Sequence, residues 1–97
     1  MPLFVLIGRD GPLGLERRKL HRAAHLERLE ANARAGTLRF AGPLRGEDGA
    51  PVGSVVVFEA ESLDAARAFA ADDPYTHGGV FESTEVFGTL QVLPREE

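Results

Sequence analysis

The segment Leu15–Ala35, LERRKLHRAAHLERLEANARA, decides the fold because its apolar side chains recur with the period of an α-helix. At about 100° per residue, one side of this helix is apolar and carries Leu15, Leu26, Leu29 and Ala33. The opposite side is charged and carries Lys19, Glu27, Glu30 and Arg34. Gly36 follows the last periodic residue, where a helix C-terminus favours glycine. This pattern predicts a long amphipathic helix.

Strands are expected on both sides of this helix. Leu3–Ile7 is a continuous apolar run, which is typical of a strand buried on both faces. After the helix, Thr37–Ala41 is predicted as a second strand that ends at Gly42-Pro43. Arg45–Gly53, rich in Gly, Asp and Pro, is predicted as an exposed hairpin loop. It leads into a third strand, Ser54–Ala60, which is apolar on both faces.

A second helix and a last strand complete the chain. Ser62 is a suitable N-cap for a helix over Leu63–Ala71, which must stop before Pro74 because proline disfavours helical backbone in the residue before it. Tyr75–Ser83 is predicted as a connection, and Thr84–Val92 as the last strand. In that strand, alternate residues from Val86 to Val92 form an apolar face.

The predicted order β-α-β-β-α-β is that of a ferredoxin-like α+β fold, with an antiparallel sheet and both helices on one face. We expect a single domain over residues 1–97. One face of such a sheet is left uncovered, although the first and third strands are apolar on both faces. A homodimer that packs two open sheet faces together would cover it and add buried area to a small core.

Composition excludes several classes of function. The chain has 43% hydrophobic and 27% charged residues, which is typical of globular proteins. Its net charge of −4, without a basic cluster, argues against a nucleic-acid partner. No apolar run approaches the roughly 18 residues that a membrane span needs, and no signal peptide is recognised. Without cysteine there is no disulfide or thiolate chemistry. We therefore expect a cytoplasmic protein.

Two cationic side chains lie where the long helix should be apolar. Arg22 falls within the apolar stripe and His25 on its edge. A buried cation must be paired or must line a pocket, since an unpaired buried charge costs several kcal/mol. The candidate partner is the sequence Asp72-Asp73-Pro74-Tyr75. We interpret His25 and Asp73 as residues that meet in a site for a small molecule.

Four motifs resemble the YCII (YciI-like) family in order and spacing. They are Arg22-Ala-Ala-His25-Leu, Ala41-Gly42-Pro43, Gly53-Ser54 and Ala71-Asp-Asp73-Pro74-Tyr75. The resemblance covers essentially the whole chain and implies a dimeric α/β-barrel built from ferredoxin-like subunits. It also implies a site built on the family's His and Asp, which match His25 and Asp73. An activity associated with the family is lyase-type dehalogenation of hydroxylated aromatic compounds. The sequence departs from the family's pattern at His21.

The chemistry of the pair follows from the residue types. Histidine titrates near neutrality, so His25 can take and return a proton. A carboxylate on one ring nitrogen fixes the tautomer and leaves the other nitrogen free to act as a base, which suits Asp73. Arg22, one turn from His25, is a candidate for binding an anionic group, and Ser54 and Tyr75 are candidates for hydroxyl hydrogen bonds. Elimination or isomerisation fits this set, because neither needs a cofactor.

Simpler interpretations stay open for each of these residues. His25 and Asp73 can form a purely structural hydrogen bond between the two helices. Arg22 can pair with an aspartate, Asp72 or Asp73. Ser54 can serve only as a strand-end hydrogen bond, and Tyr75 only as packing. The corresponding alternative function is a non-catalytic dimeric module that binds a small ligand or a partner protein.

A metal site is weighed and not predicted. His21 and His25 are four residues apart on a helix, a spacing that can chelate a metal, and a third ligand would come from Asp72, Asp73 or His77. His21, however, is expected at the solvent margin, and a catalytic zinc needs three supported ligands. We also interpret Glu16-Arg17-Arg18-Lys19 as a solvated face, and find no glycine-rich nucleotide motif.

Overall fold

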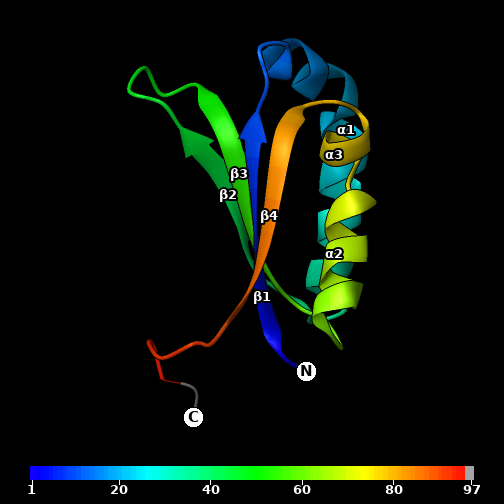
Figure 1. Ribbon diagram of the computed structural model, residues 1–97, viewed down its shortest axis with the longest axis vertical. Coiled ribbons are helices and arrows are strands. Elements are labelled where there is room, and N and C mark those ends of the chain that lie inside the picture. The colour runs from blue at the N-terminus through cyan, green and yellow to red at the C-terminus, as the bar shows by residue number, and fades with distance from the viewer. Residues whose placement is uncertain (96–97) are drawn as a thin grey trace.

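The computed structural model describes residues 1–95 and has the ferredoxin-like α+β fold that the sequence predicts (Figure 1). The elements in chain order are β1 (Leu3–Asp10), α1 (Gly14–Arg34), β2 (Leu38–Arg45), β3 (Pro51–Glu59), α2 (Leu63–Ala71), α3 (Pro74–His77) and β4 (Phe81–Thr89). The strands form one antiparallel sheet in the order β2-β3-β1-β4. All three helices lie on the same side of this sheet (Figure 1).

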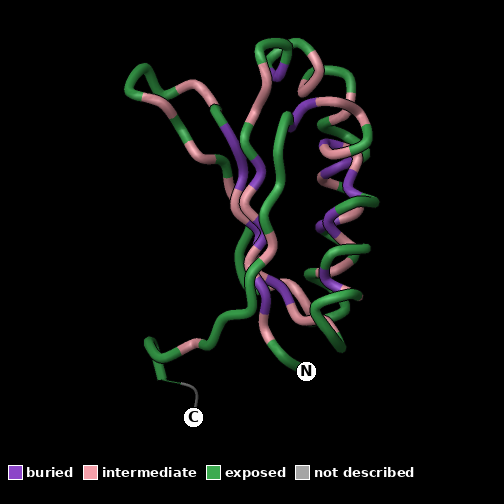
Figure 2. Tube along the Cα trace, in the orientation of Figure 1, coloured by how far each residue is buried: buried purple, intermediate pink, exposed green. Residues whose placement is uncertain are grey.

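The core lies between the sheet and the helices. Its buried side chains come from β1, β3 and the inner faces of α1 and α2, and they are Phe4, Leu6, Leu29, Val56, Phe58, Ala66 and Ala70. A second cluster, of Tyr75, Val80 and Phe81, lies where α3 leads into β4. Figure 2 shows the buried residues on the sheet and on the sides of the helices that face it. This arrangement fixes α1 and α3 over the same sheet.

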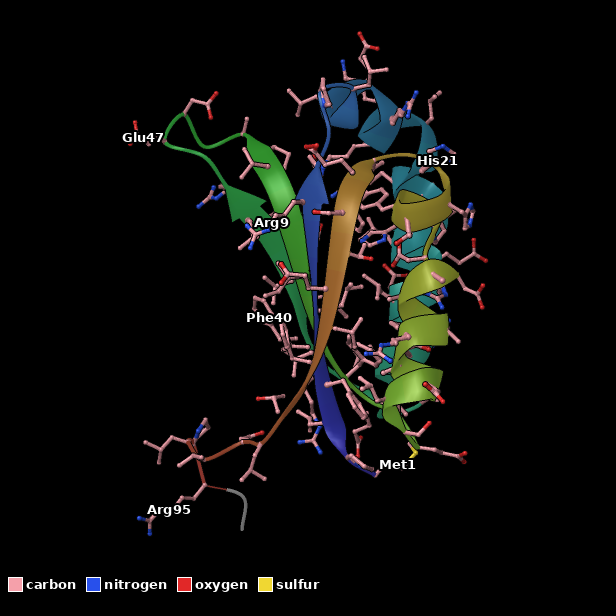
Figure 3. The ribbon with its side chains drawn as sticks, in the orientation of Figure 1. Met1, Arg9, His21, Phe40, Glu47 and Arg95 are labelled. Atoms are coloured by element: carbon pink, nitrogen blue, oxygen red, sulfur yellow. The ribbon has the colours of Figure 1, made fainter. Side chains whose placement is uncertain are left out.

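The other face of the sheet is largely apolar, and no helix within residues 1–95 covers it. Its residues alternate with the core residues along the strands, and they include Val5, Ile7, Val55 and Val57, all partly exposed. Phe40 and Phe87 are opposite Val57 and Val5 on the outer strands and are 58% and 50% exposed. Phe40 lies on the side of the sheet away from the helices (Figure 3).

The predicted end of the second strand is wrong. Gly42-Pro43 does not end β2, which continues to Arg45, with Pro43 opposite Ser54. β2 is an edge strand, and an edge strand tolerates a proline because the missing N–H can fall on the side that pairs with no strand. The hairpin loop is therefore shorter than predicted and spans only 46–50.

The region after α2 also differs from the prediction. α2 has the predicted bounds, but the expected connection contains α3, which Asp73 caps and Pro74 opens. β4 is Phe81–Thr89 and not Thr84–Val92, because Thr89 is opposite Leu3, where β1 begins, so later residues have no strand to pair with. Val92 is accordingly 70% exposed. β1 in turn runs past Gly8 to Asp10.

No helix within residues 1–95 has the length and apolarity that crossing a membrane would require.

Candidate functional site

A cavity of about 420 Å³ lies between α1 and the β2–β3 half of the sheet. α1 contributes side chains at a helical spacing, which places them on one stripe, and β2 contributes a small apolar wall at residues 41–43. The polar and charged lining residues are Arg18, Lys19, Arg22, His25, Ser54 and Tyr75. Three of them are cationic, and no carboxylate from the described part of the chain lines the cavity. The cavity is therefore suited to an anionic or electron-rich ligand.

The structure brings His25 and Asp73 together. His25 Nδ1 lies 2.7 Å from Asp73 Oδ1, and the two side chains are 8% and 0% exposed. The same oxygen accepts the backbone N–H of Tyr75 at 2.8 Å, which makes Asp73 the N-cap of α3. Because an ionised carboxylate can only accept, Nδ1 of His25 carries the proton in this bond. In the neutral ring Nε2 is then the unprotonated nitrogen.

The second oxygen of Asp73 has a cationic neighbour that the sequence did not indicate. Arg28 Nη1 lies 3.6 Å from Asp73 Oδ2, while Nη2 donates to the carbonyl of Phe69 at 2.8 Å. The Arg28 guanidinium also lies 4.0 Å from the centre of the Phe69 ring. Arg28, and not Arg22, is thus the arginine beside Asp73. Arg22 is exposed and lines the cavity.

Tyr75 holds the imidazole in place. Its ring stacks on His25 with centroids 3.8 Å apart and planes 6° apart, and the Phe81 ring packs edge-on against Tyr75 with centroids 5.8 Å apart. Burial raises the pKa of the Tyr75 hydroxyl, although the charges of Arg18 and Arg22 partly oppose this. The phenol is therefore protonated at neutral pH and is a hydrogen-bond donor in the cavity wall.

Arg18 is a site residue that the sequence analysis placed wrongly, on a solvated face. It forms two hydrogen bonds to Asp10, from Nε at 2.7 Å and from Nη2 at 2.9 Å. Burial alone would lower the pKa of Arg18, but the hydrogen bonds and charge of Asp10 raise it above its ordinary value. Arg17, from the same motif, donates to the carbonyl of Gly79 at 3.1 Å. The missed signal was spacing, since Arg18 precedes Arg22 by four residues on one helix face.

Ser54 lies opposite α1 on β3. It is 4% exposed, lines the cavity, and its Oγ accepts from Arg18 Nη2 at 3.2 Å. Four of the five predicted site residues, Arg22, His25, Ser54 and Tyr75, thus line one cavity, and Asp73 lies directly behind His25.

His21 lies away from this set and packs against the end of α3. A Cβ atom added to Gly78 would be 2.6 Å from Cδ2 of His21. His21, which is labelled in Figure 3, therefore contacts the turn after α3. Within residues 1–95, no three or more His, Asp or Glu side chains are grouped as metal ligands.

With this geometry established, the chain can be compared with known proteins. A family model described as the YCII-related domain matches residues 2–89. The chain belongs to the YCII family. Among curated relatives, Protein YciI of Escherichia coli O6:H1 is 42% identical over 90 residues, covering 87% of this chain and 92% of that protein. An uncharacterised protein of Haemophilus influenzae is 37% identical over 84 residues, covering 80% and 86%.

Two solved structures are similar to this YCII-family chain. One is 5-chloro-2-hydroxyhydroquinone dehydrochlorinase from Burkholderia phenoliruptrix AC1100, in complex with 2,5-dihydroxybenzoquinone. It is 34% identical, has a TM-score of 0.77, and the match covers 88% of this chain and 90% of that one. A NIPSNAP family protein from Agrobacterium tumefaciens, 22% identical with a TM-score of 0.50 over 95% and 93% of the chains, shares the fold alone.

Proposed function

We propose that this YCII-family protein is a small cofactor-independent lyase or isomerase. In this proposal His25, oriented by Asp73, is the general base that acts on a small phenolic or otherwise anionic molecule. The observation that carries the proposal is a buried histidine whose Nδ1 is bonded to a fully buried carboxylate and whose ring lines a cavity. A hydrogen bond with a purely structural role has no need of such a cavity beside the ring.

The proposed step is a proton transfer coupled to the loss of a leaving group. Nε2 of His25 takes a proton from the substrate, and the electron pair of the broken bond forms a new double bond. The leaving group departs with its own electron pair, so no electrons enter or leave the system. Asp73 stabilises the imidazolium that forms, and the stacked Tyr75 ring keeps it in plane. The imidazolium then returns its proton to the product or to water.

The similarity to a dehydrochlorinase favours elimination from a hydroxylated ring. A cavity of about 420 Å³ has room for a single ring. The cations that line it, Arg18, Lys19 and Arg22, favour a substrate that carries negative charge.

The test is a turnover screen with chlorinated hydroxyquinols and small enol-lactones, followed by His25→Asn. The asparagine amide can keep a donor near the position of Nδ1, so the bond to Asp73 is retained while the base is lost. We expect His25→Asn to lower kcat by at least about a hundredfold. The control variant His77→Asn, which changes an exposed histidine, should keep the wild-type rate. Turnover that survives in His25→Asn contradicts the proposal. Ligand binding without turnover of any substrate favours the alternative of a non-catalytic binding module.

We also propose that a second copy of the chain covers the open sheet face. Its apolar side chains, with Phe40 and Phe87 about half exposed, support this, and so does the small core of a 97-residue chain. A sedimentation series over protein concentration should show a dimer for wild type, and a monomer for Phe40→Asp. Leu20→Asp, at a 77% exposed position of α1, is the control that should remain dimeric. A wild-type monomer at micromolar concentration contradicts this proposal.

A further inference from the structure

A buried ion pair forms part of the cavity wall, and no residue of that pair belongs to the proposed proton-transfer machinery. The side chains of Arg18 and Asp10 are only 12% and 7% exposed. Besides its two bonds to Asp10, Arg18 Nη2 donates to the carbonyl of Gly53 at 2.8 Å and to Ser54 Oγ at 3.2 Å. These four bonds use Nε and Nη2 and leave both hydrogens of Nη1 outside them. The guanidinium is therefore fixed along its Nε–Nη2 edge, and it also interacts with the hydroxyl of Tyr75.

Arg18 also reaches the cavity. Arg18 lines the cavity, and its guanidinium carbon is 4.9 Å from the centre of the Tyr75 ring, which lines the cavity as well. The charges of both Arg18 and Arg22 act on the Tyr75 hydroxyl. Two guanidinium groups and a phenol donor therefore converge on one region, next to the imidazole on which Tyr75 stacks.

The position of Asp10 keeps this region positive. Asp10 holds Arg18 from outside the cavity lining, so the cation faces the ligand and the carboxylate does not. The backbone at Gly14 packs closely against that carboxylate, because a Cβ added at Gly14 would lie 2.7 Å from Asp10 Oδ2. A chain with a net charge of −4 thus presents cations alone among the charged groups lining this cavity.

We infer that Arg18, held by Asp10, is a specificity residue whose guanidinium acts together with Arg22 to bind a deprotonated hydroxyl oxygen of the ligand. This inference rests on the proposed function and names its substrate class. The class comprises single-ring compounds with an acidic hydroxyl group, bound as the phenolate or enolate. A planar guanidinium fixed on one edge is preorganised for this task, since little side-chain entropy is lost on binding.

The experiment is a binding titration with two matched probes, 4-nitrocatechol as its anion and its neutral dimethyl ether. Binding is read from probe absorbance and from the fluorescence of Tyr75, the one tyrosine in a chain without tryptophan. The test variants are the double substitution Asp10→Asn with Arg18→Gln, which leaves the net charge unchanged, and Arg18→Lys, which keeps the charge but lacks the second guanidinium nitrogen. Arg9→Gln is the control, because Arg9 pairs with Glu85 on an exposed part of β1.

Wild type should bind the anion more tightly than the ether. Both test variants should weaken anion binding about tenfold, with ether binding unchanged, while Arg9→Gln matches wild type. Equal loss for both probes would mean that Arg18 only supports the fold, and this result overturns the inference. Arg18→Lys keeps a cation beside Asp10, so it can be measured even if the double variant fails to fold. Anion binding that is not weakened in Arg18→Lys also overturns the inference. A wild type that binds the two probes equally overturns it as well. Because the readout is binding, a wild type that discriminates but lacks turnover rejects the proposed function alone.

Discussion

Replacing Asp73 by alanine tests whether one buried carboxylate supports both the fold and the site. The change removes the N-cap of α3, at about 1 kcal/mol. It also leaves the Nδ1–H of buried His25 without an acceptor, at about 1–3 kcal/mol. Arg28, 25% exposed, loses the neighbouring negative charge as well. These two costs add up to about 2–4 kcal/mol, a range that overlaps the cost of about 3–5 kcal/mol for breaking a buried ion pair.

The loss is measurable in a chain of 97 residues. The free energy of unfolding of such a domain is about 5–15 kcal/mol, so Asp73→Ala should still fold. Its Tm should fall by roughly 10–30 °C, at about 4–8 °C per kcal/mol for a domain of this size. Asp73→Asn, which keeps an acceptor at Oδ1, should lose much less.

Urea unfolding followed by circular dichroism measures these differences at one fixed protein concentration, because the apparent stability of an oligomer depends on concentration. The control is Ser62→Ala, which removes the N-cap of α2, where Ser62 Oγ accepts from Ala65 N at 3.1 Å in an exposed position. It should cost about 1 kcal/mol. If Asp73→Ala costs no more than Ser62→Ala, the reasoning that Asp73 is the centre of a stabilising network is wrong.

Three further outcomes are expected. Because burial raises the pKa of Tyr75 above the value of about 10 in an unfolded chain, its stabilising contribution is complete below that pH and is lost as the pH rises through the folded value. Near-ultraviolet titration of this single tyrosine checks the raised pKa, and urea unfolding at each pH checks the loss of stability. Gly14→Ala should lower Tm because the new Cβ meets Asp10, whereas a gain of about 1 kcal/mol from helix propensity alone would show that Asp10 moves freely. Leu6→Ala, at a fully buried position, should cost about 2–5 kcal/mol in urea unfolding, against less than about 0.5 for Leu20→Ala.

The strongly periodic parts of the fold could be predicted from the sequence, and the ends of the strands could not. The bounds of α2 follow from Ser62 and Pro74, which are local signals. The end of β4 depends on where β1 begins, and β2 can continue through Pro43 only because β2 is an edge strand. Both are properties of the assembled sheet, which no local pattern contains.

The site divides in the same way. His25 and Arg22 could be singled out because they interrupt an apolar stripe, and Asp73 because a proline follows it. Arg18 and Arg28 could not be assigned to Asp10 and Asp73, since an arginine in a charged run is usually solvated. Only the packing of α1 across β1 and α3 determines which arginine meets which carboxylate.

The cavity-lining cations and His25 come from one helix, and the groups that hold Arg18 and His25 come from other elements, which has an evolutionary consequence. Arg18, Arg22 and His25 all lie on one stripe of α1, while the groups that hold Arg18 and His25 come from β1, β3 and the N-cap of α3. A few substitutions along that stripe would therefore alter what the protein accepts and leave the sheet scaffold untouched. Libraries randomised at these helix positions alone are a compact starting point for redirecting the pocket toward new compounds.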